Sequence, residues 1–328
     1  MRFKLPLALV LTATLLYPAA ADASLSEFAT FVGTYGVSTD GFGSTTQSGT
    51  ISAEVPAGAT VVAAYLYTAT FSFSGPQAVG GTLDGSPIAY GPAVAQVPSC
   101  CGLSSNRADV TAIVKPIIDG GAGGVYNFTV TETNSAQDGE ALVVVYSLAS
   151  LPVSTVGILD GFSNSSGDNT AINFADPLDP TAAGFFAEMR IASSFSCCSQ
   201  TSTISVNGTT ITQNAGNFDD GLQQANGSLI TVGGYDDPFS SLLPSYGDDH
   251  ERYNLVPYIA PGDTTISVRT VNPSGDDNIF LAVFHVTGEA GINEPPPNTP
   301  IPEPGTLSLL AIGGAAVVRK VRQRRKAA

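Results

Sequence analysis

The stretch Val61–Phe73, VVAAYLYTATFSF, decides the fold class. Its aromatic side chains are spaced by even numbers of residues, so they share one face of an extended chain: Tyr65, Tyr67, Phe71 and Phe73. The other face is small or polar beyond Leu66. This alternation predicts a long, half-buried β-strand whose aromatic face packs in a core and does not serve as a ligand platform.

Two further stretches are almost continuously apolar, Leu142–Tyr146 and Ile279–Phe284. Runs of this length predict strands in the middle of a sandwich, buried on both faces. The chain between them is rich in Gly, Ser, Thr, Asn and Val, with frequent turn signals and no Trp. Together these features predict an all-β protein.

The chain also contains a diverged internal repeat. Residues 126–148 align without gaps on residues 264–286, an offset of 138. Both copies read as strand, polar turn, apolar strand. Upstream, Leu83-Asp84-Gly85 parallels Val206-Asn207-Gly208, and both Asp-Gly and Asn-Gly favour tight hairpin turns.

A short Asp-Val-Thr turn at Asp109–Thr111, followed by Gly and an alternating strand, resembles bacterial jelly-roll modules, including carbohydrate-binding modules. The resemblance implies only the fold, because these residues build the end of a sandwich and do not touch sugar. We therefore expect two tandem, jelly-roll-like β-sandwiches, residues 24–150 and 151–290, followed by a Pro-rich spacer at 291–301.

The N-terminus reads as a secretory signal peptide over residues 1–23. Arg2 and Lys4 precede a short apolar core, and Ala21-Asp22-Ala23 fits the small-residue cleavage site. We expect signal peptidase to cut before Ser24. The apolar core is too short for a retained membrane anchor.

The C-terminus, residues 302–328, contains Pro302-Glu303-Pro304-Gly305, an apolar run over residues 307–318 and an Arg-rich end. Together these parts resemble the PEP-CTERM sorting signal. The resemblance implies recognition and processing by an exosortase in a Gram-negative bacterium, often one that makes exopolysaccharide, which makes exopolysaccharide a candidate partner. It places the body in the outer envelope, on the cell surface or in the extracellular matrix.

The apolar run of this signal predicts a helix that is the chain's only contact with the membrane. Twelve residues make a helix of roughly 18 Å, against a hydrocarbon core of roughly 30 Å. Such a span suits transient anchoring in the inner membrane before processing. The alternative is a C-terminal anchor that is never cut. The basic tail would keep the C-terminus on the cytoplasmic side.

The body is strongly acidic. Residues 24–290 carry 25 Asp and Glu against five basic residues, a net charge of −20. Such a surface repels phosphate backbones, so we expect no nucleic-acid partner. It also favours cations, which makes calcium the one cofactor to consider.

Acidic pairs recur in the sequence, and calcium prefers several carboxylate and carbonyl oxygens on a loop. The best candidate ligands are Asp248 and Asp249 near Glu251, and Asp276 with Asp277. No segment carries a complete calcium motif, and Asp is also common in solvated turns. The sequence therefore leaves two interpretations open, a calcium site and solvated turns.

The four cysteines form two adjacent pairs, Cys100-Cys101 and Cys197-Cys198. An exported protein favours disulfides, and four cysteines allow three pairings between which the sequence cannot choose. Adjacent cysteines lack the usual spacing of a zinc site.

No catalytic constellation is evident. A Ser-His-Asp triad would need His250 or His285, and the chain has neither a G-x-S-x-G elbow nor an H-E-x-x-H motif. We expect no enzyme, and rank an envelope hydrolase last. The first hypothesis is a structural or adhesive surface protein. The second is a lectin-like module, in which Tyr235, Tyr246 and Tyr253 replace the missing Trp.

Overall fold

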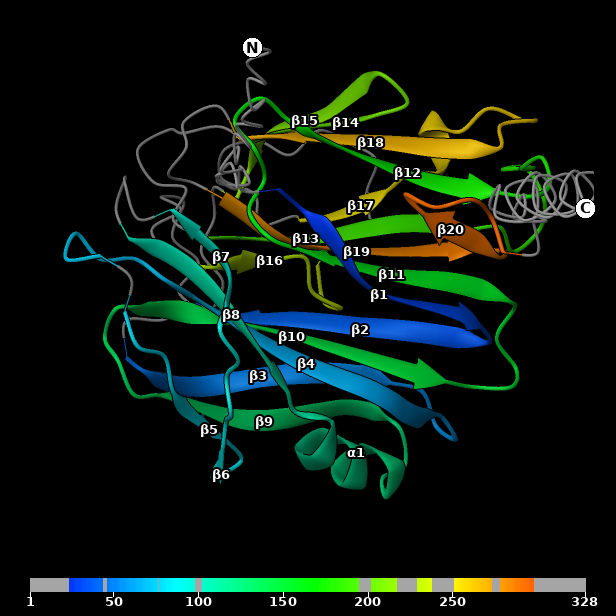
Figure 1. Ribbon diagram of the computed structural model, residues 1–328. Helices are drawn as coiled ribbons and strands as arrows, with labels where there is room; N and C mark the ends of the chain where they lie inside the picture. Colours follow the sequence, from blue (N-terminus) through cyan, green and yellow to red (C-terminus); the bar gives the residue numbers. More distant parts are fainter. Residues whose placement is uncertain are drawn as a thin grey trace, which may run out of the picture.

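The computed structural model describes residues 24–43, 46–75, 77–97, 102–194, 202–216, 229–237, 251–272 and 278–297. These residues form four β-sheets stacked face to face, with one short α-helix and one 3-10 turn (Figure 1). The predicted all-β class is confirmed. The finer jelly-roll resemblance stays a prediction.

The first two sheets form one sandwich. Outer sheet 1 has the order β3 (Ser48–Val55), β9 (Gly124–Glu132), β5 (Gly81–Leu83), β6 (Ser86–Pro87). Inner sheet 1 has the order β2 (Tyr35–Phe42), β10 (Gln137–Ser147), β4 (Thr60–Thr70), β8 (Leu103–Asp109), β7 (Ala93–Val97). Helix α1 (Thr111–Asp119) closes one end and buries Val114 and Ile118.

The other two sheets form the second sandwich. Inner sheet 2 has the order β1 (Ser26–Gly33), β11 (Ser154–Asp160), β19 (Asn278–Thr287), β13 (Ala187–Ser194), β16 (Thr231–Val232), and β17 (Arg252–Asn254) also pairs with β13. Outer sheet 2 has the order β15 (Thr209–Ala215), β14 (Ser202–Val206), β18 (Thr265–Val271), β12 (Asp168–Phe174), β20 (Ala290–Ile292). The 3-10 turn η1 (Val256–Tyr258) occupies the place that α1 has in the first sandwich.

The two sandwiches repeat the same strand order, as the predicted internal repeat requires. The series β3-β9-β5-β6 corresponds to β12-β18-β14-β15, and β2-β10-β4-β8 corresponds to β11-β19-β13-β17. The hairpin turns match in detail. Asp84 and Asn207 have φ of 46° and 47°, as a tight turn requires. Each side-chain oxygen accepts a hydrogen bond from the backbone N–H of the neighbouring strand, Thr129 (2.7 Å) or Ser267 (2.8 Å).

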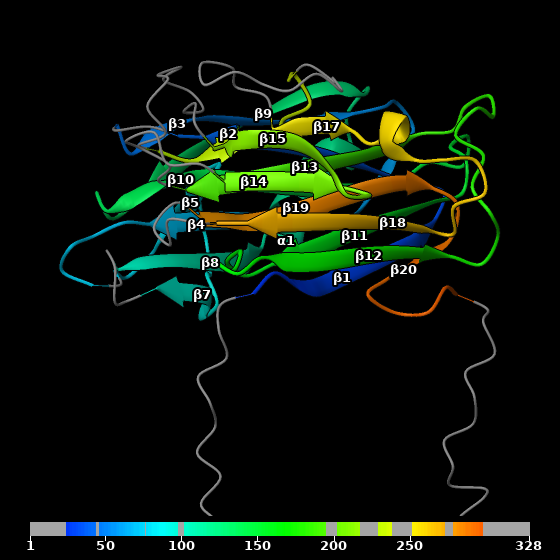
Figure 2. The same cartoon turned by 90° about the horizontal axis from the view of Figure 1, so that it is seen from above.

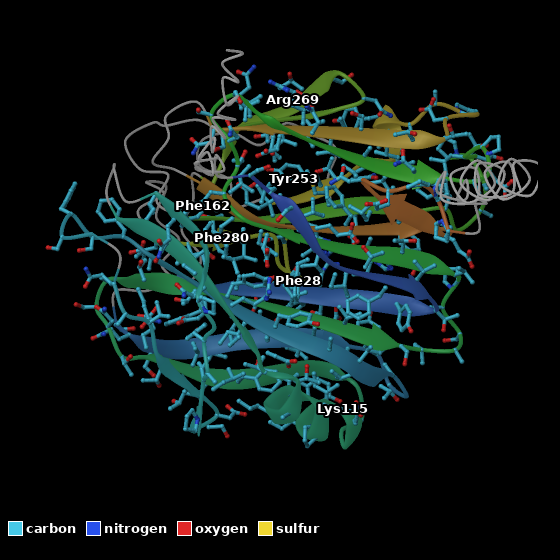
Figure 3. The ribbon with its side chains drawn as sticks, in the orientation of Figure 1. Phe28, Lys115, Phe162, Tyr253, Arg269 and Phe280 are labelled. Carbon is cyan, nitrogen blue, oxygen red and sulfur yellow. The ribbon has the colours of Figure 1, made fainter. Side chains whose placement is uncertain are left out.

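Three buried layers lie between the four sheets. The layer inside the first sandwich includes Leu66 and Phe128, and the layer inside the second includes Phe284. A middle layer joins the two inner sheets and includes Tyr67 and Phe280; Phe280 is labelled in Figure 3. The two sandwiches therefore share a core instead of following one another as separate units.

Because of the middle layer, the strand that decided the fold class differs from its prediction. The predicted strand is present as β4, but both of its faces are buried, because Leu66 points into the first sandwich and Tyr67 into the middle layer. Phe71 and Phe73 lie beyond its end, and Phe73 is 88% exposed. The predicted strand was therefore too long, and it is not half-buried.

Two predicted boundaries also differ from the structure. β1, placed by sequence in the first module, pairs with β11 in inner sheet 2. The predicted spacer at 291–301 overlaps β20, whose Ile292 is buried in the second sandwich. Both differences arise because edge strands are selected by long-range pairing, which leaves little trace in local sequence.

A candidate binding cleft between the two sandwiches

A cleft of about 320 Å³ opens where the two sandwiches meet. Its walls come from both halves of the chain: Val37, Ser38, Glu54, Tyr146, Phe186, Glu188, Arg190, Tyr235, Arg252 and His285. Aromatic, hydroxyl and charged side chains thus converge on one volume. That volume is at the small end of the range of about 300–1,000 Å³ that is usual for ligand sites.

Residues 229–237 bring Tyr235 to this cleft by bridging the two inner sheets. Tyr235 N–H donates to the Thr39 carbonyl (2.9 Å) in β2, while Gly233 N–H donates to the Ile191 carbonyl (2.8 Å) in β13. A Cβ atom on Gly233 would lie 2.1 Å from the Glu251 carbonyl oxygen, so the bridge has no room for a side chain here. The position of Tyr235 therefore depends on the contact between the sandwiches.

Glu188 is the electrostatic centre of the cleft. Its Oε1 accepts from Arg190 (2.8 Å), and its Oε2 accepts from Arg252 Nε (3.1 Å). His285 Nδ1 lies 3.5 Å from Oε1. Burial alone would raise the pKa of Glu188, but the hydrogen bond with His285 and the two arginine charges outweigh it and hold the pKa at about 2.

The cations of the acidic body gather at this junction. Of its five basic residues, Arg107, Arg190 and Arg252 each pair with a carboxylate beside the middle layer. Lys115 and Arg269 lie at the two opposite ends of the stack (Figure 3). The junction thus holds three of the body's five basic side chains, each paired with a carboxylate.

Ser154, His285 and Glu188 lie in the order of a catalytic triad, which the sequence did not suggest. His285 Nε2 is 3.3 Å from Ser154 Oγ. However, Ser154 is fully buried, its hydroxyl donates to the Tyr35 carbonyl (2.8 Å), and Glu188 is engaged by two arginines. A substrate has no access to this serine, so the arrangement holds the strands together and does not supply a nucleophile.

An acidic group borders the cleft around Gly234. A Cβ atom there would lie 2.7 Å from an Asp236 oxygen, 3.3 Å from an Asp40 oxygen and 3.6 Å from an Asp237 oxygen. Burial, followed by the Asp236 charge, raises the pKa of Asp40 to about 7 and of Asp237 to about 6. Within the described ranges, no three His, Cys, Asp or Glu side chains are arranged to hold a metal ion.

Among the predicted calcium ligands, the structure describes only Glu251. It is fully buried in the second sandwich, and its oxygens accept from Gly216 N–H (2.7 Å) and from the Tyr253 hydroxyl. Burial raises its pKa to about 7. Both oxygens of Glu251 therefore already have protein partners. Four predicted ligands lie outside the described residues: Asp248, Asp249, Asp276 and Asp277.

The other predicted site residues also lie outside the described part: the four cysteines, Cys100, Cys101, Cys197 and Cys198, and the sorting residues Pro302, Glu303, Pro304 and Gly305. The disulfides stay a prediction. Of the three tyrosines proposed to replace Trp, Tyr235 lines the cleft and Tyr246 lies outside the described residues. Tyr253 is only 2% exposed, so the prediction that it could contact sugar is wrong.

Sequence reasoning missed Glu54, Glu188 and Arg190. The only local signal is in β13, AEMRIASS, where Glu188 and Arg190 fall two residues apart on one face of an apolar strand. Charges in such a position need partners when buried. Nothing local indicates that Arg252 and His285, more than sixty residues away, supply them.

Residues 300–325 match the PEP-CTERM protein-sorting motif. The match confirms the resemblance read from Pro302-Glu303-Pro304. The PEP-CTERM motif indicates exosortase processing and export to the cell envelope or surface. No curated protein and no solved structure matches the chain.

The predicted membrane-spanning helix and the signal peptide lie outside the described residues. Within the part of the chain that the structure does describe, no helix combines the length and apolar character needed to cross a bilayer.

Proposed function

We propose that the folded body is a non-catalytic structural or adhesive component of the bacterial cell surface or extracellular matrix. The PEP-CTERM motif at residues 300–325 carries the export part of this proposal. The shared middle layer supports the structural part, since it makes the two sandwiches one stiff body. The burial of Ser154 argues against hydrolysis by the nearest triad-like group.

The two ends of the described chain support a tethered orientation. The Ser24 hydroxyl donates to Asp168 (2.6 Å), and Asn293 N–H donates to the Ala171 carbonyl (2.7 Å), so both ends lie against β12. Figure 2 shows β1 and β20 along one long side of the stack, with β2, β3 and β17 along the other. A body held through its C-terminus would present the cleft side away from the attachment.

Deletion of the gene in the producing bacterium, with complementation, tests this proposal. The intact gene should restore surface adhesion or matrix cohesion, whereas a gene lacking residues 302–328 should not, because its product is not sorted. A S154A variant of the intact gene should complement fully if no serine hydrolysis is involved. Unchanged adhesion in the deletion strain would contradict the proposal.

The cleft favours a second candidate function, glycan binding. Tyr146, Phe186 and Tyr235 offer aromatic rings for stacking on sugars, and Glu54 and Arg252 offer hydrogen-bonding groups for hydroxyls. Its volume of about 320 Å³ suits one or two sugar rings.

A glycan array run with calcium and with chelator tests this function. Specific binding should be lost in Y235A and retained in F73A, because Phe73 is an exposed aromatic residue outside the cleft. Absence of binding by the folded protein would leave only the structural role. Equal binding by both variants would place the sugar elsewhere.

A further inference from the structure

Polar side chains occupy one end of the core of the first sandwich, where the apolar layer ends. Glu132, the last residue of β9, and Glu140 in β10 meet there, with Thr68 of β4 beside them. Glu132 is 4% exposed and Glu140 is 0% exposed. Two carboxyl groups therefore face one another away from water.

Several of the polar atoms at this point have no hydrogen-bond partner. They are both carboxyl oxygens of Glu132 and Oε2 of Glu140. The Tyr90 hydroxyl faces the Thr68 hydroxyl. Gln137 Nε2 lies 3.4 Å from the remaining oxygen, Glu140 Oε1, and 3.2 Å from the Thr68 hydroxyl. Buried polar groups are almost always satisfied, so this group of atoms requires an explanation.

Two ionised carboxylates cannot remain together in an apolar environment without positive charge. Burial raises the pKa of Glu132 to about 8 and raises that of Glu140 as well. A shared proton would remove the repulsion. It would form one O–H···O bond, however, and would leave the second Glu132 oxygen still without a partner.

A bound cation would give every one of these carboxyl oxygens a partner. We propose that Glu132 and Glu140 bind a calcium ion at this end of the first sandwich, with the Tyr90 hydroxyl as a further ligand. The available ligands are all oxygens, which is the set that hard divalent cations select. Calcium fits better than magnesium, because it accepts irregular geometry and sheds its water more readily.

This site is separate from the cleft and from the acidic loops of the sequence prediction. It rests on neither the surface role nor the glycan-binding role. Calcium modules of extracellular proteins commonly bind in the range of about 10⁻⁴–10⁻³ M, which is compatible with an exported chain. Since both ligand-bearing strands are core strands, binding would stabilise the whole first sandwich.

The test is thermal unfolding of the exported protein, first freed of metal with chelator and then titrated with calcium chloride at pH 7. At a hundredfold excess over Kd, we expect the Tm to rise by roughly 5 °C. E132Q and E140Q should lose this rise. Both variants remove a buried charge and keep the volume, so they should still fold.

Glu251 supplies the matched control. It is an equally buried glutamate, but both of its oxygens have protein partners. E251Q should therefore keep the calcium response. Terbium luminescence gives a second readout, since Tyr90 would sensitise a bound ion and Y90F would abolish that part of the signal. A protein whose Tm ignores calcium would overturn the proposal in favour of a shared proton. A response that survives in E132Q and E140Q would also overturn it.

Discussion

The hydroxyl of Tyr67 in inner sheet 1 donates a 3.1 Å hydrogen bond to the carboxylate of Asp160 in inner sheet 2. The same carboxylate forms a salt bridge with Arg107, whose guanidinium lies 3.3 Å above the Phe28 ring of β1. One acidic side chain thus connects strands of both sandwiches, next to the apolar middle layer. This connection makes the stability of the two halves interdependent.

Replacing Asp160 with Ala should therefore destabilise the whole body. Arg107 and Tyr67 would lose their shared acceptor, and breaking a largely buried ion pair typically costs about 3–5 kcal/mol. Denaturant unfolding measures the change. D119N is the control, because it breaks the exposed Lys115–Asp119 pair and keeps an acceptor for the Val61 N–H, and such pairs contribute about 0–1 kcal/mol. Equal losses in the two variants would show that Asp160 does not link the sandwiches.

The two sandwiches should also unfold in one transition. The chain has no Trp, so single Trp probes can be introduced at Tyr126 in the first sandwich and at Tyr258 in the second. Both probes should report the same midpoint. F280A, in the middle layer, should lower that midpoint for both probes by the equivalent of about 3–5 kcal/mol. Two separate midpoints in the parent protein would contradict a shared core.

The ionised carboxylate of Glu188 should stabilise the junction at neutral pH and lose this effect in acid. Its pKa in the folded protein is about 2, against 4.5 unperturbed, so its stabilisation is complete above pH 4.5 and is lost as the pH falls toward 2. E188Q should be less stable than the parent protein at pH 7 by about 3 kcal/mol, and the difference should shrink below pH 4.5. Urea unfolding at several pH values measures it. A difference that is constant with pH would indicate a role in packing alone.

The pH dependence of stability that Asp40 contributes should have the opposite sign. Its pKa rises from 3.8 to about 7, so the folded state holds a proton that the unfolded state releases. Stability from this group is therefore present below pH 3.8 and falls as the pH rises to 7. D40N should stabilise the protein at pH 8 by on the order of 1–3 kcal/mol and have little effect at pH 3. The unfolding midpoint at the two pH values is the readout, and a destabilised D40N at pH 8 would refute this account.

The individual strands were largely predictable because local patterns encode them. The alternation in Val61–Phe73 and the apolar runs at residues 142–146 and 279–284 correspond to β4, β10 and β19. The turns at Asp84 and Asn207 were predictable as well, since few residues adopt a positive φ there. A gapless alignment sufficed to detect the duplication through these turns.

The candidate cleft was not predictable in the same way. Its charged centre joins Glu188 to Arg252 and His285, and Glu54 enters from the other half of the chain. Tyr235 and Tyr253 were indistinguishable in sequence, yet one lines the cleft and the other is buried beside Glu251. Residue type alone does not indicate which neighbours a distant strand will bring.

The sequence by itself determined the all-β class, the repeated order of strands and turns, and the PEP-CTERM sorting motif at residues 300–325. These depend on local periodicity, on backbone conformations that few residues adopt, and on a short contiguous signal. Only the tertiary structure decided that β1 joins β11, that Tyr67 packs against the second sandwich, and that Glu132 meets Glu140. A hydrophobic pattern specifies that a face must be buried, but the partner that buries it is chosen by contacts between residues far apart in the chain.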